Sequence, residues 1–241
     1  MEQTPLKIAS FNIRAGLGTD WRRQPVRVLD QINRMAPDVI ALQEADFRMG
    51  ARAPALPPAL IREHTALEAL PIGANGISLG WHGNAILARP EITLSDIHRI
   101  DLPGAEPRGA VIADLAHAGD AAFALRLVAV HLGLLRHSRR QQLDHIRSRL
   151  AQLQHLPTVI LGDFNEWSKV RGLGRVAKDY ILHTPPATFP AVRPTVPLDR
   201  MVATPDVSLR FVDVAKGQFP YPSDHLPIMA ELRIDGRGRG Q

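Results

Sequence analysis

Residues 157–165 read PTVILGDFN, and this stretch carries the strongest signal for fold and function. The apolar run from Thr158 to Leu161 is typical of a short strand buried on both faces. In a pleated strand, residues i and i+2 point the same way, so Asp163 and Asn165 face one point if strand geometry continues past Gly162. Phe164 between them then points back into the core. The stretch therefore predicts a core strand whose end presents two polar side chains.

Residue types suited to catalysis also stand at the ends of other predicted strands. Five further strands end or begin this way: Leu6–Phe11 before Asn12, Asp38–Leu42 before Gln43 and Glu44, Ala122–Leu132 with His131 near its end, Arg200–Ala203 after Asp199, and Leu226–Ile234 after Asp224 and His225. Each residue alone has an ordinary explanation, such as a turn for Asn12 or a surface ion pair for Asp199. Gathered at one rim, however, the set forms an oxygen-rich pocket for a hard divalent ion, with imidazoles beside it.

The remaining pattern predicts an α/β protein in which strands outnumber helices. Helical periodicity covers Trp21–Met35, Ala59–Leu70 and the basic segment His137–Leu153. Further strands are expected at Asn84–Ala88, Glu91–Ile100, Arg108–Leu115 and Ser208–Val214, and loops at Arg48–Pro58 and Gly172–Pro197. Strands in adjacent runs indicate two sheets stacked between outer helices. Without a repeat or a break in composition, we expect one domain over residues 1–235 and a flexible basic tail at 236–241.

Composition narrows the chemistry and the partners. The 241 residues include no cysteine, so a metal would be bound by oxygen or imidazole ligands. No N-terminal apolar segment or long apolar stretch is present, which favours a cytoplasmic protein without stable membrane insertion. The net charge of +5, with arginine far outnumbering lysine, suits an anionic partner such as nucleic acid or a lipid headgroup. The alternative is that a GC-rich genome inflates arginine and alanine.

Several short motifs together resemble a known family. Asn12 lies in SFNIR, Glu44 in ALQE, His131 in HL, and the segments GDFN at 162–165 and SDH at 223–225 follow in the same order as in the endonuclease/exonuclease/phosphatase superfamily. GNAILAR at 83–89 and EPRGA at 106–110 are also similar to segments of that superfamily. The resemblance spans nearly the whole chain. It implies a four-layer α/β/β/α sandwich of two mixed, mostly antiparallel sheets flanked by helices.

The resemblance also implies roles around a metal ion and an attacking water. Glu44 resembles the principal Mg²⁺ ligand, with Asn12 close to the same ion, and Asp224 resembles a second ligand or a support for His225. His225 resembles the general base, and Asp199 the acid that orients its imidazole. Asp163 resembles the group that orients or deprotonates the nucleophile, or assists the leaving oxygen. Which of Asp163 and His225 takes the proton stays open.

Other matched positions are expected to contact the phosphate or the leaving group. Asn165 resembles a hydrogen-bond donor to a phosphate oxygen, and Arg108 an arginine that contacts the phosphate in DNase-like members. His131 resembles a second histidine of the DNase and sphingomyelinase branches, which protonates the leaving group or stabilises developing charge. Arg14 departs from the family pattern and is expected to add positive charge and to bind substrate.

These expectations define a Mg²⁺-dependent phosphodiester hydrolase in which Mn²⁺ can substitute. Nucleic acid is the first expected substrate because Arg136, Arg139 and Arg140 follow His131 within about one helical turn and can form a basic face. The alternative for these arginines is a solvated helix face. A phospholipid or a small phosphoester is the second candidate substrate. A non-catalytic binding module is disfavoured because every catalytic position is filled, and the sequence indicates no protein partner.

Overall fold

The computed structural model describes residues 5–168, 173–183 and 185–235, and these residues form two six-stranded sheets. The first sheet has the order β11-β12-β1-β2-β4-β3, and the second has the order β5-β6-β7-β8-β10-β9. The strands of the first are β1 (Leu6–Asn12), β2 (Val39–Gln43), β3 (Glu68–Ala69), β4 (Ala85–Ala88), β11 (Val207–Val212) and β12 (Ile228–Ile234). Those of the second are β5 (Ile92–Leu102), β6 (Arg108–His117), β7 (Asp120–His131), β8 (Thr158–Asp163), β9 (Ile181–His183) and β10 (Asp199–Ala203).

Both sheets are mixed and mostly antiparallel. In the first sheet, β1 pairs in parallel with β2, and the other pairings are antiparallel. In the second sheet, β7 pairs in parallel with β8, and the other pairings are antiparallel. Each parallel pair lies near the middle of its sheet, so its strands are covered on both sides. This explains why β2 and β8 read as continuous apolar runs without alternation.

The main core lies between the two sheets. Along β2, Val39 and Ala41 point into this core, while Ile40 and Leu42 point to the outer face. Along β8, Leu161 points into the same central core and Ile160 points outward. The period of two thus sorts neighbouring residues of one strand into separate apolar layers.

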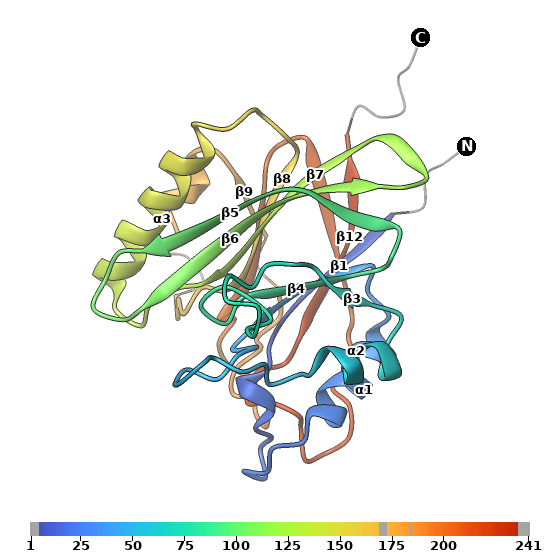
Figure 1. Ribbon diagram of the computed structural model, residues 1–241. Coiled ribbons are helices and arrows are strands. Elements are labelled where there is room, and N and C mark those ends of the chain that lie inside the picture. Colours follow the sequence, from blue (N-terminus) through green and yellow to red (C-terminus); the bar gives the residue numbers. More distant parts are fainter. Residues whose placement is uncertain (1–4, 169–172, 184, 236–241) are drawn as a thin grey trace.

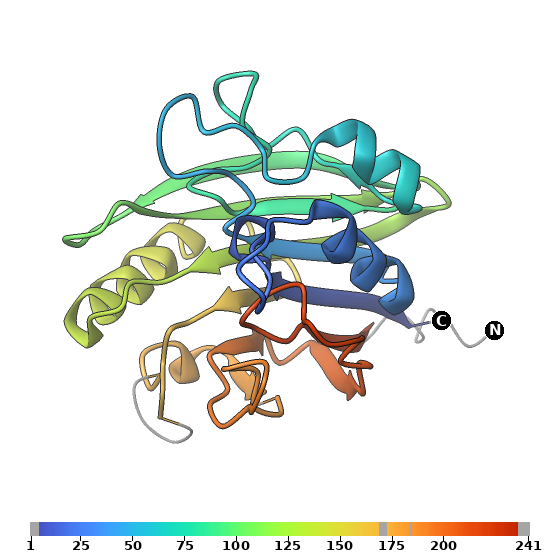
Figure 2. The same ribbon diagram turned by 90° about the horizontal axis from the view of Figure 1, so that it is seen from below.

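Helices cover the two outer faces. The helices α1 (Pro25–Met35) and α2 (Pro58–His64) pack on the first sheet, and α3 (Arg136–Leu150) packs on the second. Figure 1 shows α3 on one side of the stacked sheets and α1 with α2 on the other, and Figure 2 shows the same layers from below. The molecule is therefore a four-layer α/β/β/α sandwich, as predicted.

Every strand predicted from the sequence is present, but the helix boundaries and one loop differ, and the third helix, predicted over His137–Leu153, runs from Arg136 to Leu150. The first helix begins at Pro25 instead of Trp21, because proline starts a helix readily and disfavours helical geometry in the residue before it. The second predicted helix, Ala59–Leu70, ends at His64, after which β3 pairs with β4. The region Gly172–Pro197 is not only loop, since it contains β9 and the short 3-10 helix η2 (Val176–Lys178). The predicted tail at 236–241 lies outside the described residues.

Within the described part of the chain, no helix is long and apolar enough to cross a membrane. α3 has 15 residues, and its exposed face carries charged side chains such as Arg136 and Arg140. The three helices therefore serve as outer layers on the sheets.

Candidate active site

The register of the second sheet places three site residues in one row. In the β7–β8 pair, His131 stands opposite Asp163, and in the β8–β10 pair, Asp199 stands opposite the same Asp163. The row comes from three strands that are far apart in the sequence. Asp199 is the first residue of β10 and is fully buried, so it is part of the strand and not of a surface loop before it.

Gly162 allows this row to form. Its φ is +146°, and a Cβ placed on it would overlap the carbonyl oxygen of Val130 on β7. Only glycine fits a backbone that approaches its neighbour this closely in this conformation. The strand extends beyond the predicted apolar run Thr158–Leu161 and continues through Gly162 to Asp163.

A tight turn, and not continued strand geometry, orients Asn165. Its φ is +49°, a left-handed conformation that asparagine tolerates better than most residues. The backbone N–H of Asn165 donates to Asp163 Oδ1 at 2.9 Å, and Asn165 Nδ2 donates to the carbonyl of Leu132 at 2.9 Å. Phe164 is fully buried in the core beneath α3, as expected. Asp163 and Asn165 therefore do share one cleft, but through an Asx-type turn.

The first sheet brings Asn12 and Glu44 to the same place. Asn12, the last residue of β1, donates from Nδ2 to Asp163 Oδ2 at 3.0 Å, which joins the two sheets across the central core. Glu44 directly follows β2 and has a φ of +54°, a costly conformation for a residue without special tolerance of it. Gly83 packs against the Glu44 backbone, and its φ of +79° is a conformation that favours glycine.

The SDH segment is fixed between the sheets by hydrogen bonds. Ser223 Oγ donates to the carbonyl of Asn12 at 2.7 Å and accepts from the backbone N–H of His225 at 3.2 Å. His225 Nδ1 lies 2.9 Å from Asp199 Oδ2, so the imidazole is held by a fully buried carboxylate. His225 Nε2 is turned toward Asp163 Oδ2 at 3.9 Å.

Asp163 is the centre of this arrangement. Its side chain is 2 % exposed, and its Oδ2 also lies 3.5 Å from His131 Nε2. Burial raises the pKa of Asp163 to about 6, against the opposing effect of the positive charge on His225. Burial alone would lower the pKa of His225, but Asp199 and the other nearby carboxylates outweigh it and raise that pKa to about 10. Burial and the neighbouring charge of Arg108 keep the pKa of His131 well below its usual range.

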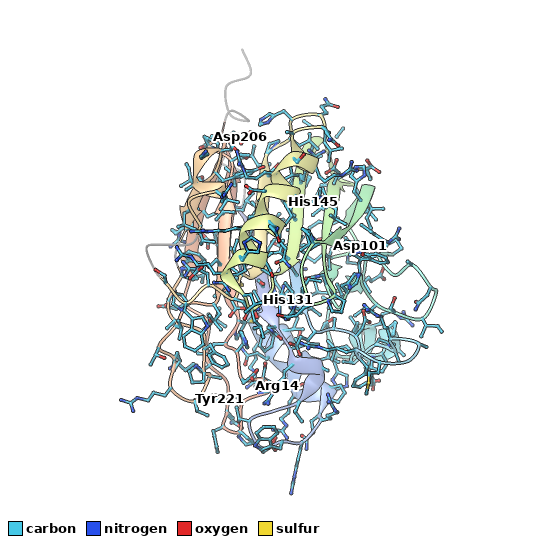
Figure 3. All side chains as sticks on the ribbon, turned by 90° about the vertical axis from the view of Figure 1, so that its left-hand side faces the viewer. Arg14, Asp101, His131, His145, Asp206 and Tyr221 are labelled. Atoms are coloured by element: carbon cyan, nitrogen blue, oxygen red, sulfur yellow. The ribbon has the colours of Figure 1, made fainter. Side chains whose placement is uncertain are left out.

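The ten residues singled out from the sequence meet at one cleft of about 300 Å³. Nine line it: Asn12, Arg14, Glu44, Arg108, His131, Asp163, Asn165, Asp224 and His225. The tenth, Asp199, lies directly behind His225. Figure 3 shows Arg14 and Tyr221 at the end of the molecule opposite Asp206, with His131 between them and the upper part of α3. The structure thus brings the whole predicted set together, while the role of each residue stays a prediction.

Each carboxylate or arginine at the cleft has a defined partner. Arg14 Nε lies 3.3 Å from Asp224 Oδ2, and Arg48 NH2 lies 3.0 Å from Glu44 Oε1. Arg108 is held by Glu106 at 2.8 Å. Arginines beside the acidic groups offset their charge and leave further N–H donors for an anion.

The sequence did not single out the aromatic residues of the cleft. Trp167 and Phe189 line it, with ring centroids 6.3 Å apart, and Phe189 lies 5.1 Å from the His225 ring. Phe189 belongs to the region Gly172–Pro197, which the sequence analysis predicted as a loop without site residues. The only available signal for Trp167 was its position two residues after GDFN.

The donor set fits a magnesium ion. The described residues contain no group of three or more His, Asp or Glu side chains arranged as metal ligands. Mg²⁺, however, is usually held by one or two carboxylates, waters and substrate phosphate oxygens, and not by a closed protein cage. Glu44, Asn12 and Asp224 supply oxygen atoms at the same cleft, so they are the residues suited to hold such an ion.

Arg139 is not part of a basic substrate face, in contrast to the prediction for α3. It is buried and pairs with the buried Glu166 at 2.9 Å. Its NH1 also donates to the carbonyl of Leu134. Arg136 and Arg140, on the same helix, are exposed. Arg139 therefore ties α3 to the segment after GDFN.

Two stacked sheets with a polar cleft at the ends of their central strands define the class of sandwich-fold phosphoesterases. The model of the Endonuclease/Exonuclease/phosphatase family matches residues 9–225, and the chain belongs to this family. Members of the family are hydrolases that act on phosphoesters and generally use a divalent metal.

Individual proteins are similar to this chain in sequence or in fold. The chain is 27 % identical over 254 residues to the "Uncharacterized protein YbhP" of Escherichia coli K12, covering 97 % of this chain and 98 % of that protein. Its fold is similar to that of the mannosyl-6-phosphatase Bt3783 of Bacteroides thetaiotaomicron, with a TM-score of 0.73, 17 % identity, and coverage of 95 % and 100 % of the two chains. It is also similar to D. rerio TDP2 complexed with a single-strand DNA product, with a TM-score of 0.66, 17 % identity, and coverage of 96 % and 100 %.

Proposed function

We propose that the protein is a Mg²⁺-dependent phosphodiester hydrolase that acts on nucleic acid. The observation that carries this proposal is the connected set Asp199–His225–Asp163–Asn12, which joins both sheets beside Glu44 in one cleft. An imidazole held by one buried acid and turned toward another is suited to move a proton from an attacking water.

The chain's own residues divide the work around the phosphate. Asp199 holds the His225 ring, and either His225 Nε2 or Asp163 takes the proton of the water, with Asn12 donating to Asp163. Arg108 and Asn165 lie where they can donate to phosphate oxygens, and His131 lies on the same wall, suited to the leaving group. Mg²⁺ held by Glu44, Asn12 and Asp224 would offset charge on the phosphate oxygens and lower the pKa values of groups beside it.

Features of the cleft mouth support nucleic acid as the substrate. Arg14 and Arg48 lie in the cleft and can contact a phosphate backbone. Trp167 is 62 % exposed at its edge and offers a ring on which an unpaired base can stack. The solved TDP2 complex holds a single-strand DNA product on the same fold.

A lipid or a small phosphoester is the second candidate. Leu134 lines the cleft and is exposed, and Leu135 beside it is exposed as well. Aliphatic side chains do not stack on bases but can contact acyl or sugar carbons. The mannosyl-6-phosphatase shows that this fold also carries phosphatase activity on a sugar.

Hydrolysis of a substrate panel tests the proposal. Plasmid DNA, single-stranded DNA, RNA, bis-p-nitrophenyl phosphate and anionic and choline phospholipids are incubated with Mg²⁺, Mn²⁺ or EDTA, and the His225→Ala variant serves as the blank. The proposal is supported if the wild type cleaves nucleic acid in a metal-dependent way and the His225→Ala variant does not. Cleavage of lipid without cleavage of nucleic acid favours the second candidate, and activity of the variant equal to that of the wild type would contradict the site.

A further inference from the structure

A second cavity of about 130 Å³ lies directly beside the reaction cleft. The two share one wall, formed by Glu44, Arg48, Arg108 and His131. The far side of the second cavity is built by the segment after β2, which includes Arg52, and by His82 before β4. A group bound to the scissile phosphate can therefore extend past His131 into a separate space.

Some of the arginine N–H groups around this cavity have no hydrogen-bond acceptor. Arg48, Arg52 and Arg108 line it, together with three acids. Both carboxylate oxygens of Asp46 accept backbone N–H groups, from Leu79 at 2.7 Å and from Gly80 at 3.1 Å.

The other two acids are also engaged. Glu106 accepts from Arg108 at 2.8 Å and from the backbone N–H of Leu134 at 3.2 Å, and Glu44 accepts from Arg48 at 3.0 Å. Among the described residues, the guanidinium of Arg52 forms no hydrogen bond or ion pair with any of these acids, although its charge acts on the nearby Asp46. The cavity is thus lined by acids whose charges are already offset and by arginine N–H groups that remain available.

His82 adds an independent observation. Its Nε2 lies 2.8 Å from Asp101 Oδ1, which fixes the ring. Its Nδ1 is buried and has no hydrogen-bond partner among the described residues. A buried polar atom left without a partner is unfavourable, and in the imidazolium form, with Nε2–H directed at the Asp101 carboxylate, Nδ1–H can donate to a ligand oxygen. Gly109 leaves the space that the His82 ring occupies, because a Cβ there would lie 2.8 Å from His82 Cδ2.

We propose that this cavity binds a second phosphate group, carried on the leaving-group side of the substrate next to the scissile ester. The inference rests on the proposed phosphodiester hydrolysis and specifies its substrate. Arginine guanidinium groups with free donors favour phosphate oxygens because their N–H groups match that geometry in pairs. The shared wall at His131 connects the bound phosphate to the leaving oxygen. The preferred substrate is then a diester with a neighbouring phosphomonoester, from either a nucleotide or a phosphorylated lipid headgroup.

Kinetics with paired substrates test this inference. Dithymidylate with a terminal phosphate at either end is compared with unphosphorylated dithymidylate, and glycerophosphoinositol with a ring phosphate is compared with the plain compound. We expect the phosphorylated member of one pair to have a kcat/KM at least about tenfold higher, mostly through KM. The pair that shows the preference identifies the nucleotide or the headgroup source. Equal kcat/KM values within both pairs would overturn the inference even if hydrolysis itself is observed.

A matched pair of arginine variants tests whether the preference for the phosphorylated substrate arises at this cavity. In Arg52→Gln, the ratio of kcat/KM for phosphorylated to plain substrate should fall toward one. In Arg62→Gln, which alters an exposed arginine on α2 away from both cavities, the ratio should stay at the wild-type value. A preference that survives in Arg52→Gln would contradict the assignment of the cavity.

Binding without turnover separates this inference from the proposed function. Inorganic phosphate is titrated by calorimetry into the Mg²⁺-loaded His225→Ala variant and into the same variant carrying Arg52→Gln. Weaker binding in the second protein by about tenfold supports the phosphate site, even if no diester in the panel is cleaved. Equal binding in both proteins would refute it.

Discussion

Asp163 contacts side chains from three other segments of the chain. Asn12 comes from β1, His131 from β7 and His225 from the segment before β12, and Asp199 stands opposite Asp163 on β10. The Asn12–Asp163 bond joins residues that are 151 positions apart. At the scale of single residues, the site depends on strand register, because a slip by one residue would turn each of these side chains to the other face.

Replacing Asp199 by asparagine should reduce turnover without unfolding the protein. The amide keeps the size of the side chain but cannot hold His225 in the same protonation state and tautomer. We expect kcat to fall by about 10²–10⁴-fold with an unchanged circular dichroism spectrum. Kinetics on the best substrate of the panel measure this, and a loss smaller than about threefold would show that Asp199 does not act on His225.

Replacing Gly162 by alanine should destabilise the fold. The new Cβ would overlap the Val130 carbonyl in a backbone conformation that side chains rarely adopt. We expect a loss of at least ~3 kcal/mol in the free energy of unfolding, measured by urea denaturation. Gly174→Ala is the matched control, because a Cβ there meets nothing within 4 Å. Equal stability of the two variants would contradict the close approach of β7 and β8.

The polar residues of the cleft could be predicted from the sequence, but its aromatic residues could not. Short motifs such as GDFN and SDH keep polar residues at fixed offsets from apolar runs, so Asp163 and His225 could be found. Phe189 lies in a segment without periodicity, and its contact with His225 depends on how that loop folds back. The predicted geometry of Asn165 was wrong in detail, because the chain forms a turn after Asp163 and does not continue the alternation of a strand.

At the scale of elements, α3 is attached to the cleft through its buried polar side chains. Arg139 pairs with Glu166, and Gln142 accepts from the backbone N–H of Gly133 and donates to the carbonyl of Pro103. These contacts fix the segments that follow β5, β7 and β8. The apolar face of α3 was predictable from the spacing of Leu143 and its neighbours, but the burial of Arg139 was not, because composition alone marks arginine as exposed.

Arg139→Ala should be much more destabilising than Arg140→Ala. Removing Arg139 leaves the buried Glu166 carboxylate without its partner, which typically costs ~3–5 kcal/mol. Arg140 is exposed, so its removal should change the free energy of unfolding by no more than about 0.5 kcal/mol. Thermal and urea unfolding of both variants measure the difference. Equal effects would mean that the Arg139–Glu166 pair does not hold α3 in place.

The helix boundaries show where local pattern and tertiary pairing compete. Apolar spacing continued past His64, yet Glu68 and Ala69 form an edge strand on β4. A two-residue strand has no period of its own and exists only because the neighbouring strand offers hydrogen bonds. The two-sheet arrangement was predictable, in contrast, because long apolar runs require cover on both faces.

At the scale of the whole molecule, the cleft lies where the two sheets meet. One sheet supplies Asn12 and leads into Glu44, and the other supplies His131 and Asp163. Glu44 and Asn12 both lie at the end of the first sheet, so a metal ion bound there would bind only when β1 and β2 are correctly paired. Binding of such an ion should be visible as increased stability of the entire fold.

Mg²⁺ should raise the melting temperature of the wild type but not of Glu44→Gln. At a free Mg²⁺ concentration tenfold above its Kd, the stabilisation of about 1.4 kcal/mol corresponds to a rise of about 3–6 °C. Glu63→Gln, which changes an exposed acid on α2, should respond like the wild type. Differential scanning fluorimetry with and without EDTA measures this. The same rise in Glu44→Gln would place the ion elsewhere.

The pairing of β1 with β12 has a consequence for how the protein is made. β1 holds Asn12 and is synthesised early, but its antiparallel partner and the adjoining His225 leave the ribosome more than 200 residues later. Until then, the first sheet lacks two of its strands, and Asp163 has no histidine from the SDH segment. On the proposed function as a nuclease, a nascent chain should therefore be inert toward the messenger and ribosomal RNA that surround it until the segment through Ile234 has been synthesised.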